Sequence, residues 1–212
     1  MQAELDGVLG AGTKRRLPSP DDMGSLPVLR ACVDETLRMF PAAPLTNRVA
    51  LQDDVIDGYN IPAGTVRSLL SLRDGVSRFA FLERFPSCSL RVFTECAAAA
   101  QDIFICPGVL HRLPSLWTNP GVFSLDRWLP KPEGAAAGAG EGLAVGSFTY
   151  MPFLVGPHGC IGRRFAHLEA CTTLAVILQR FSFAPVAGRE VRATLRVTQR
   201  PNPSLQLMVT PR

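Results

Sequence analysis

The chain has 212 residues, of which 47% are hydrophobic and 19% charged, a balance typical of a globular domain with a substantial core. Its net charge of +4 is mild and forms no dense basic stripe, which argues against a nucleic acid partner. The six cysteines are scattered without a CxxC pair, so a reduced environment fits better than a disulfide framework. We find neither a run long enough for a membrane-spanning helix nor a signal-peptide pattern.

The first part of the chain predicts two helices and several short strands. Residues 2–9 resemble the end of a helix, and the Gly/Pro/Asp-rich residues 11–25 predict a loop. Leu26 to Phe40 is predicted to be a helix that ends before Pro41. The predicted strands that follow are 47–51, 55–61 (punctuated by Asp57-Gly58) and 102–106.

The second part predicts irregular structure, one long helix and a terminal hairpin. Residues 111–130 are a proline- and tryptophan-rich meander, and 131–146 form a low-complexity loop. A helix is expected over 160–181, and the tail alternates loosely through 191–195 and 205–209, which predicts a hairpin. The apolar residues expected along one broad face of the long helix are Ile161, Phe165, Leu168, Leu174, Ile177, Leu178 and Phe181.

The most informative segment is 153–162, FLVGPHGCIG, where a cysteine lies among glycines just before the long helix. Gly156 allows the backbone to bend and to approach a flat ligand, and Gly162 removes bulk close to the sulfur. A helix that begins at Cys160 would place its positive dipole end near the sulfur and favour the thiolate. The pattern therefore predicts an ionised sulfur that binds a metal.

Two further segments occur in the order and spacing of one known family. Glu35 and Arg38 are three residues apart, so they share a face of the predicted helix and can pair. Arg127 lies in the segment 123–128 (FSLDRW), which follows the segment 117–120 (WTNP). With the FxxGxxxCxG pattern, these segments resemble the cytochrome P450 family from about residue 26 to residue 185. The resemblance implies a mainly α fold with small β-sheets (α+β), the C-terminal portion of the cytochrome P450 fold.

The resemblance also implies a cofactor and the residues that hold it. The cofactor is haem b, with the Cys160 thiolate as the axial iron ligand, which makes Cys160 the candidate catalytic and metal-binding residue. Phe153 would screen the sulfur from water. His158 stands where many relatives carry an arginine facing a haem propionate, so anchoring would be weaker and more pH-dependent. The cofactor-binding residues implied are Cys160, Phe153, Gly156, His158, Gly162 and Arg48, the last at a second propionate-binding position.

Other residues are expected to support the fold. Glu35, Arg38 and Arg127 resemble the family's structural triad, which fixes the meander beneath the haem. His111 and Arg112 are interpreted as structural, as in the family's HRxP segment. The remaining expectations are that Ile161 and Phe165 belong to the core and that His167 is exposed.

The resemblance covers one partial cytochrome P450 domain, 1–212, and implies that the chain is a fragment of a protein more than twice as long. Within it we distinguish the ExxR helix and strands (26–65), the strand and meander (102–130), the flexible loop (131–146), the haem-thiolate loop and long helix (147–185) and the C-terminal hairpin (186–212). Residues 66–101 interrupt the family pattern. We interpret them as a retained intron translated in frame, since valine codons begin with GT and glutamine can be CAG; a lineage-specific loop is the alternative.

The implied activity is that of a haem-thiolate monooxygenase that oxidises a small apolar substrate with O2. Its electrons would come from NADPH-cytochrome P450 reductase or a ferredoxin-type donor. Two alternatives stay open: an inactive fragment, or a P450-like isomerase or lyase acting on hydroperoxides. Localisation is not predicted from the chain, although full-length relatives typically reside in the endoplasmic reticulum membrane or in organelles.

Overall fold

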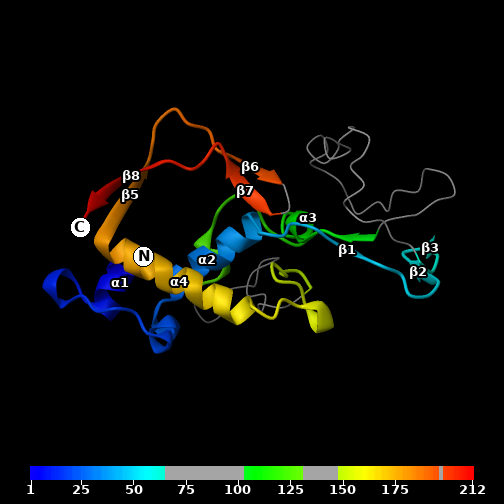
Figure 1. Cartoon of the computed structure of the whole chain (residues 1–212), viewed down its shortest axis with the longest axis horizontal. Coiled ribbons are helices and arrows are strands. Elements are labelled where there is room, and N and C mark those ends of the chain that lie inside the picture. Colours follow the sequence, from blue (N-terminus) through cyan, green and yellow to red (C-terminus); the bar gives the residue numbers. More distant parts are fainter. Residues whose placement is uncertain (65–102, 131–147, 196–197) are drawn as a thin grey trace. The chain divides into compact units, whose positions relative to one another are not determined.

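The computed structural model describes residues 1–64, 103–130, 148–195 and 198–212. The expected insert 66–101 and the expected loop 131–146 therefore lie outside the described residues. The chain divides into two units, one formed by residues 1–44 with 106–212 and the other by residues 45–105. Figure 1 labels the elements of both units.

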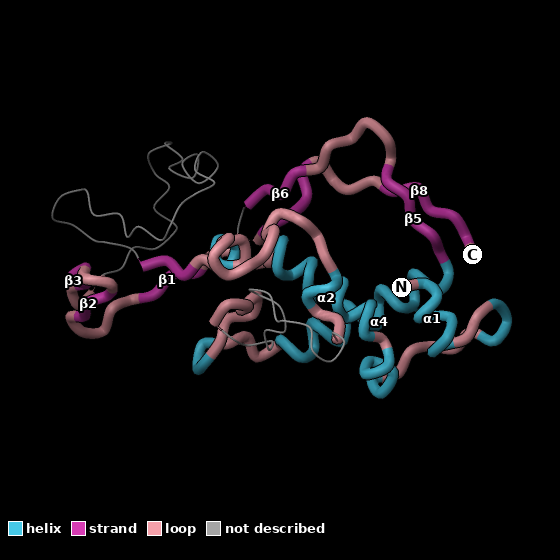
Figure 2. Tube along the Cα trace, turned by 180° about the vertical axis from the view of Figure 1, so that it is seen from behind, coloured by secondary structure: helices cyan, strands magenta, loops and turns pink. Residues whose placement is uncertain are grey.

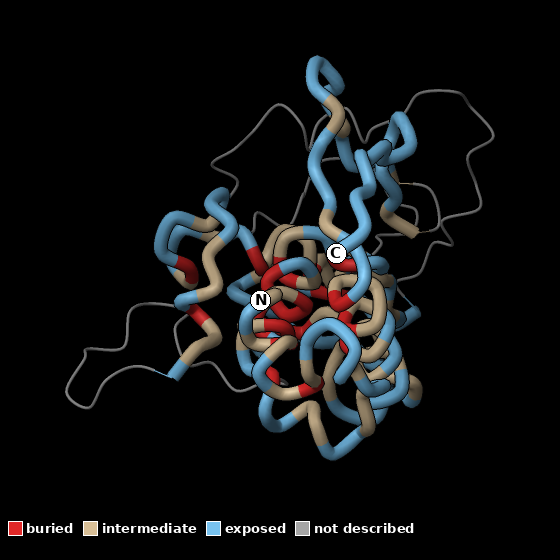
Figure 3. Tube along the Cα trace, turned by 90° about the vertical axis from the view of Figure 1, so that its left-hand side faces the viewer, coloured by how far each residue is buried: buried red, intermediate tan, exposed pale blue. Residues whose placement is uncertain are grey.

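Three helices build the larger unit: α1 (Gln2–Leu9), α2 (Pro27–Met39) and α4 (Arg163–Arg180). Shorter helical elements join them, and all of these helices stand out in cyan in Figure 2. Buried residues, red in Figure 3, gather inside this unit, where α1, α2 and α4 contact one another. The buried apolar cluster consists of Leu5, Leu9, Leu26, Leu29, Val33, Cys171 and Ala175. The shorter elements are η1 (Gly12–Lys14), η2 (Pro20–Ser25), α3 (Pro107–Leu110), η4 (Leu125–Arg127) and η5 (Gly156–His158).

A side chain from α1 caps the start of α2. The Glu4 carboxylate accepts the backbone N–H groups of Val28 (2.7 Å) and Leu29 (3.0 Å). These N–H groups belong to the first turn of α2, where no intrahelical partner exists and where the helix dipole favours a negative charge. Leu26, the residue that precedes the helix, offers no capping side chain. The two helices are thereby joined by polar contacts as well as by their apolar faces.

The strands form antiparallel pairs. In the smaller unit, β1 (Thr46–Arg48) pairs with β4 (Ile103–Ile105), and β2 (Asp54–Ile56) pairs with β3 (Tyr59–Ile61). In the larger unit, β5 (Phe181–Pro185) pairs with β8 (Leu207–Pro211), and β6 (Arg192–Leu195) pairs with β7 (Gln199–Asn202). Helices with small sheets are the α+β arrangement predicted for a partial P450 fold.

The first predicted strand, 47–51, is observed as Thr46–Arg48, and three further predictions also differ from the structure. Residues 55–61 contain a hairpin turn instead of one strand, because Asp57 and Gly58 both adopt positive φ (50° and 81°), as a tight hairpin turn requires. The tail is not one hairpin: residues 207–211 pair with the strand that leaves α4. The long helix begins at Arg163 and not at Cys160, with Gly162 as its N-cap. Within the part of the chain that is described, no helix combines the length and apolarity needed to span a membrane.

Candidate functional site

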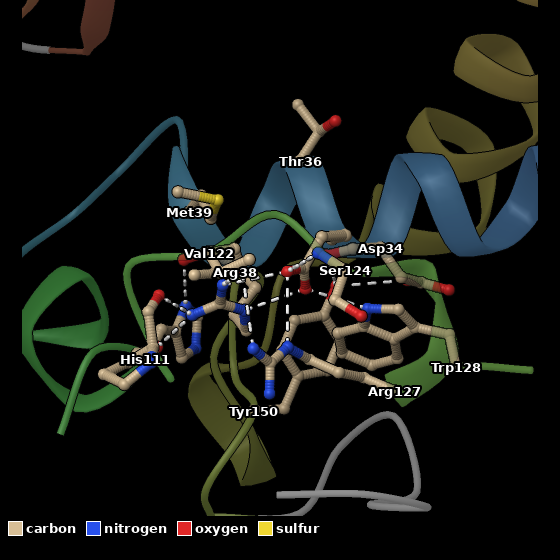
Figure 4. Close-up of polar contacts among 12 residues, drawn as sticks. Asp34, Thr36, Arg38, Met39, His111, Val122, Ser124, Arg127, Trp128 and Tyr150 are labelled. Carbon is tan, nitrogen blue, oxygen red and sulfur yellow. Dashed lines mark hydrogen bonds and ion pairs between the residues drawn. The ribbon is translucent and has the colours of Figure 1, made fainter. Parts of the chain in front are cut away.

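A buried carboxylate lies at the centre of the larger unit. Glu35, fully buried on α2, pairs with Arg38, which is labelled in Figure 4, one turn along the helix, with Nε–Oε2 at 2.8 Å and Nη2–Oε1 at 2.9 Å. Arg127 Nε approaches the same carboxylate at 3.4 Å. The structure thus brings together the three residues of the expected triad, and all three side chains are buried. Because buried charges require partners, we expect this cluster to stabilise the fold.

Two further donors to Glu35 were not anticipated from the sequence. The backbone N–H of Ser124 lies 2.9 Å from Oε1, and the Trp128 indole N–H lies 3.0 Å from Oε2. Burial by itself would raise the pKa of Glu35, but the hydrogen bonds from Arg38, Ser124 and Trp128 outweigh it and lower that pKa. Ser124, Arg127 and Trp128 all lie in the FSLDRW segment. Its sequence alone does not show that the Trp128 indole donates to the same carboxylate as Arg127.

The two arginines use their remaining N–H groups to hold irregular backbone. Arg38 donates to the carbonyl oxygens of His111 (2.8 Å), Pro120 (2.9 Å) and Val122 (3.3 Å). Arg127 donates to those of Asn119 (3.0 Å) and Val122 (3.3 Å). Since a guanidinium group carries several donors in a fixed plane, each arginine can satisfy carbonyl groups that have no strand or helix partner. These hydrogen bonds therefore hold the meander against α2.

A second polar network connects α2, α4 and the segment before the cysteine loop. The buried Tyr150 hydroxyl donates to Asp34 of α2 (Oδ1 at 3.1 Å), and His167 Nε2 of α4 lies 3.2 Å from the same oxygen. The hydrogen bond with Asp34, helped by one with Cys171, raises the pKa of His167 to about 9. Our expectation that His167 is exposed is wrong, because only 25% of its side chain is accessible and it faces this carboxylate. Burial raises the pKa of Tyr150.

The cysteine loop closes on itself and leaves the sulfur-bearing residue exposed. The Cys160 N–H donates to the carbonyl of Phe153 (2.8 Å), and the Gly159 N–H donates to that of Gly156 (2.9 Å). Gly156 adopts a φ of 71°, a conformation that favours glycine. Because α4 begins at Arg163, its first turn follows the cysteine instead of containing it. Cys160 itself is exposed.

The apolar side chains that follow the cysteine are uncovered. Ile161 is fully exposed and Phe165 is 70% exposed, so our expectation that they belong to the core is wrong. The physical reason is that α4 packs against the other helices through Cys171 and Ala175, at least a turn and a half further along. An exposed thiol beside exposed apolar groups fits a flat apolar ligand such as a haem.

The other predicted haem contacts lie as follows. Phe153 is half-buried, and His158 is exposed at the end of η5. A Cβ added at Gly162 would lie 3.8 Å from Cys160 Sγ, so this glycine keeps space free near the sulfur, whereas a Cβ at Gly156 would meet no atom within 4 Å. Arg48 belongs to the other unit, where its guanidinium donates to the Asn47 carbonyl (2.7 Å) and Thr46 Oγ1 (3.2 Å).

Comparisons with known proteins identify the family. The sequence model of the family described as Cytochrome P450 matches residues 1–72 and 99–209. This chain belongs to the cytochrome P450 family, whose members are haem-iron monooxygenases. The unmatched stretch, 73–98, falls within the expected insert.

Individual relatives agree with this assignment. The chain is 29% identical over 201 residues to "Cytochrome P450 97B2, chloroplastic" of Glycine max, covering 85% of this chain and 28% of the relative. It is 27% identical to "Protein LUTEIN DEFICIENT 5, chloroplastic" of Arabidopsis thaliana, covering 100% and 28%. The crystal structure of the cytochrome P450DA heme domain is similar with a TM-score of 0.68 and 28% identity, covering 100% and 36%. The chain thus spans about a third or less of these proteins.

Proposed function

We propose that this chain carries the thiolate side of the haem site of a P450 monooxygenase, in which the Cys160 thiolate would bind the iron of haem b. The observation that supports it is an exposed cysteine at the end of a loop closed onto Phe153, beside the uncovered side chains of Ile161 and Phe165. When bound, the haem would supply the activation of O2 for oxidation of a small apolar substrate. The other residues described at this site would hold the haem or shield the sulfur.

The residues of this chain would hold and shield that group. Cys160 would bind the iron, and the half-buried Phe153 would keep water from the sulfur. Gly156 and Gly162 would let the macrocycle approach the backbone. His158, exposed at the end of η5, would bind a propionate by a hydrogen bond.

The electron donor would be NADPH-cytochrome P450 reductase or a ferredoxin-type protein. Its binding is supported by basic side chains that α2 and the start of α4 contribute around a cleft of about 330 Å³ in the larger unit. Arg30, Arg163, Arg164 and the readily protonated His167 line it, and Asp34 is the acidic group among its lining residues. Such a surface favours a partner with acidic groups at the contact.

The test is spectroscopic. The purified 212-residue chain, loaded with haem, reduced and exposed to carbon monoxide, should give the displaced Soret band of a thiolate-ligated haem. Cys160→Ser should abolish this band, whereas the matched control Cys32→Ser, a change on α2, should keep it. An unchanged band in Cys160→Ser would refute the ligand assignment.

Turnover tests the activity separately. With a reductase, NADPH and an apolar substrate, a monooxygenase yields one hydroxylated product and one water for each O2 consumed. Haem uptake without O2-dependent product would leave the ligand assignment intact and refute the proposed activity for this chain.

A further inference from the structure

The segment that enters the cysteine loop is held by a histidine from a distant part of the chain. Tyr150 and Met151 are both buried, and the Met151 N–H donates to His111 Nε2 at 2.9 Å. His111 directly follows α3 and is itself fully buried. A backbone contact of this kind fixes the position of the chain whatever side chain residue 151 carries.

The geometry also determines which ring nitrogen of His111 carries the proton. A backbone N–H can only donate, so Nε2 must be unprotonated and Nδ1 must carry the hydrogen. Nδ1 then donates to the Arg38 carbonyl oxygen at 3.2 Å, at the end of α2. The groups facing the ring, Arg38, Arg112, Trp117 and Tyr150, offer no negative charge that would favour a second proton. Burial first, then the nearby arginines, lowers the pKa of His111 to about 4.

His111 and Arg38 are joined in both directions. The Arg38 guanidinium donates to the His111 carbonyl at 2.8 Å, while the His111 ring donates to the Arg38 carbonyl. Arg38 is held in place by its ion pair with the buried Glu35, so the hydrogen bonds between Arg38 and His111 also hold the imidazole in place. The ring therefore connects a rigid part of the molecule to Met151.

From Met151 the loop continues to the cysteine by backbone hydrogen bonds. The Leu154 N–H donates to the Met151 carbonyl (3.0 Å), and the Cys160 N–H donates to the Phe153 carbonyl (2.8 Å). A shift at Met151 is therefore transmitted to the residue that bears the sulfur.

We propose that His111 is a positioning residue for Cys160, acting through its hydrogen bond with the Met151 amide. The role of the sulfur as haem ligand rests on the proposed function, but the positioning of the loop does not. This role goes beyond the structural role expected from the sequence, because it assigns one bond of the imidazole to the placement of the thiolate loop.

Two substitutions separate the two bonds of the ring. In His111→Gln, the terminal amide extends as far as Nε2 did, so its oxygen can accept the Met151 N–H while the bond with Arg38 is lost. In His111→Asn, the shorter amide can replace Nδ1–H as donor to Arg38, while the Met151 N–H is left without an acceptor. Both replace an imidazole by a neutral amide, so each controls for the loss of the ring.

The first measurement needs no haem. Hydrogen exchange at the Cys160 amide should be about tenfold faster in His111→Asn, as expected for loss of one buried hydrogen bond, and within about twofold of wild type in His111→Gln. Equal exchange in the two variants, including equal loss of structure in both, would overturn the proposal. An unchanged exchange rate of the Cys160 amide in His111→Asn would also overturn the proposal.

The second measurement uses the loaded protein. The fraction of reduced, carbon monoxide-bound haem with the thiolate-type Soret band should fall further in His111→Asn than in His111→Gln. Equal fractions in the two variants would also overturn the positioning role. If the wild-type chain takes up no haem, the proposed function fails, and the exchange comparison still decides the role of His111.

Discussion

Replacing Glu35 by glutamine tests whether the buried ion cluster holds the larger unit together. Glu35→Gln keeps the shape of the side chain and removes its charge. The carboxylate oxygens accept hydrogen bonds from Arg38, Arg127, Ser124 and Trp128. In glutamine, one of these oxygens becomes an NH2 group, which can only donate and so opposes the donors that face it.

The expected cost follows from burial. Arg38 is fully buried and the Arg127 side chain is 5% exposed, and their other described hydrogen-bond acceptors are neutral carbonyl groups. Glu35→Gln therefore leaves two guanidinium charges in a region of low dielectric without a counter-charge. Breaking a buried pair in this way typically costs about 3–5 kcal/mol. We expect a loss of that size in the free energy of unfolding, a large part of the stability of a single domain.

Urea unfolding followed by tryptophan fluorescence measures this loss, because the Trp128 indole contacts Glu35 directly. The matched control is Glu190→Gln: Glu190 also pairs with an arginine, Arg192 at 3.1 Å, but its side chain is 76% exposed. The control should unfold at the same urea concentration as wild type. If Glu35→Gln is also indistinguishable from wild type, the buried cluster does not stabilise the fold as argued.

His111 and His167 predict opposite pH dependences of the stability, both measurable from urea midpoints. The pKa of His111 is lowered from 6.5 to about 4, so its contribution to the free energy of unfolding is complete above pH 6.5 and is lost as the pH falls through 4. We expect this loss to be about 3 kcal/mol and to be absent in His111→Gln. The pKa of His167 is raised from 6.5 to about 9, so its stabilising pair with Asp34 is complete below pH 6.5 and is lost as the pH rises through 9; about 2 kcal/mol is expected, and Asp34→Asn should remove it. A flat profile across either window would contradict the corresponding assignment.

The sequence allowed the triad to be predicted but not the partners that complete it. Helical spacing places Glu35 and Arg38 on one face, and the family pattern supplies Arg127. The indole of Trp128 and the amide of Ser124 could not be assigned, because an irregular segment has no periodicity from which the direction of a donor follows.

The main features that the sequence did not predict are contacts between residues that are far apart in the chain. Asp34 meets Tyr150 and His167 at separations of 116 and 133 residues, and His111 meets Met151 at a separation of 40 residues. A histidine on its own gives no indication of which buried group it faces. The error for His167 arose in this way, since its partner lies on another helix.

The apolar positions near the cysteine show a different limit of sequence analysis. Periodicity identifies Ile161 and Phe165 as apolar but does not indicate which element covers them. In the structure, the buried contacts of α4 occur further along, at Cys171 and Ala175. Exposed apolar groups beside an exposed cysteine support the proposed ligand surface, and their exposure is seen only in the structure.

The polar face of α2 explains how a loop with little regular structure can be placed accurately. Asp34, Glu35 and Arg38 are buried, although burying such groups is costly unless their hydrogen bonds are made. Apolar contacts have no direction and tolerate small shifts, whereas each hydrogen bond restricts both distance and angle. Tyr150, Met151 and the meander reach this face or the His111 ring next to it by such bonds. Because the proposed haem ligand would have to be positioned within a narrow range, polar anchors would suit its supporting loop better than a purely apolar core.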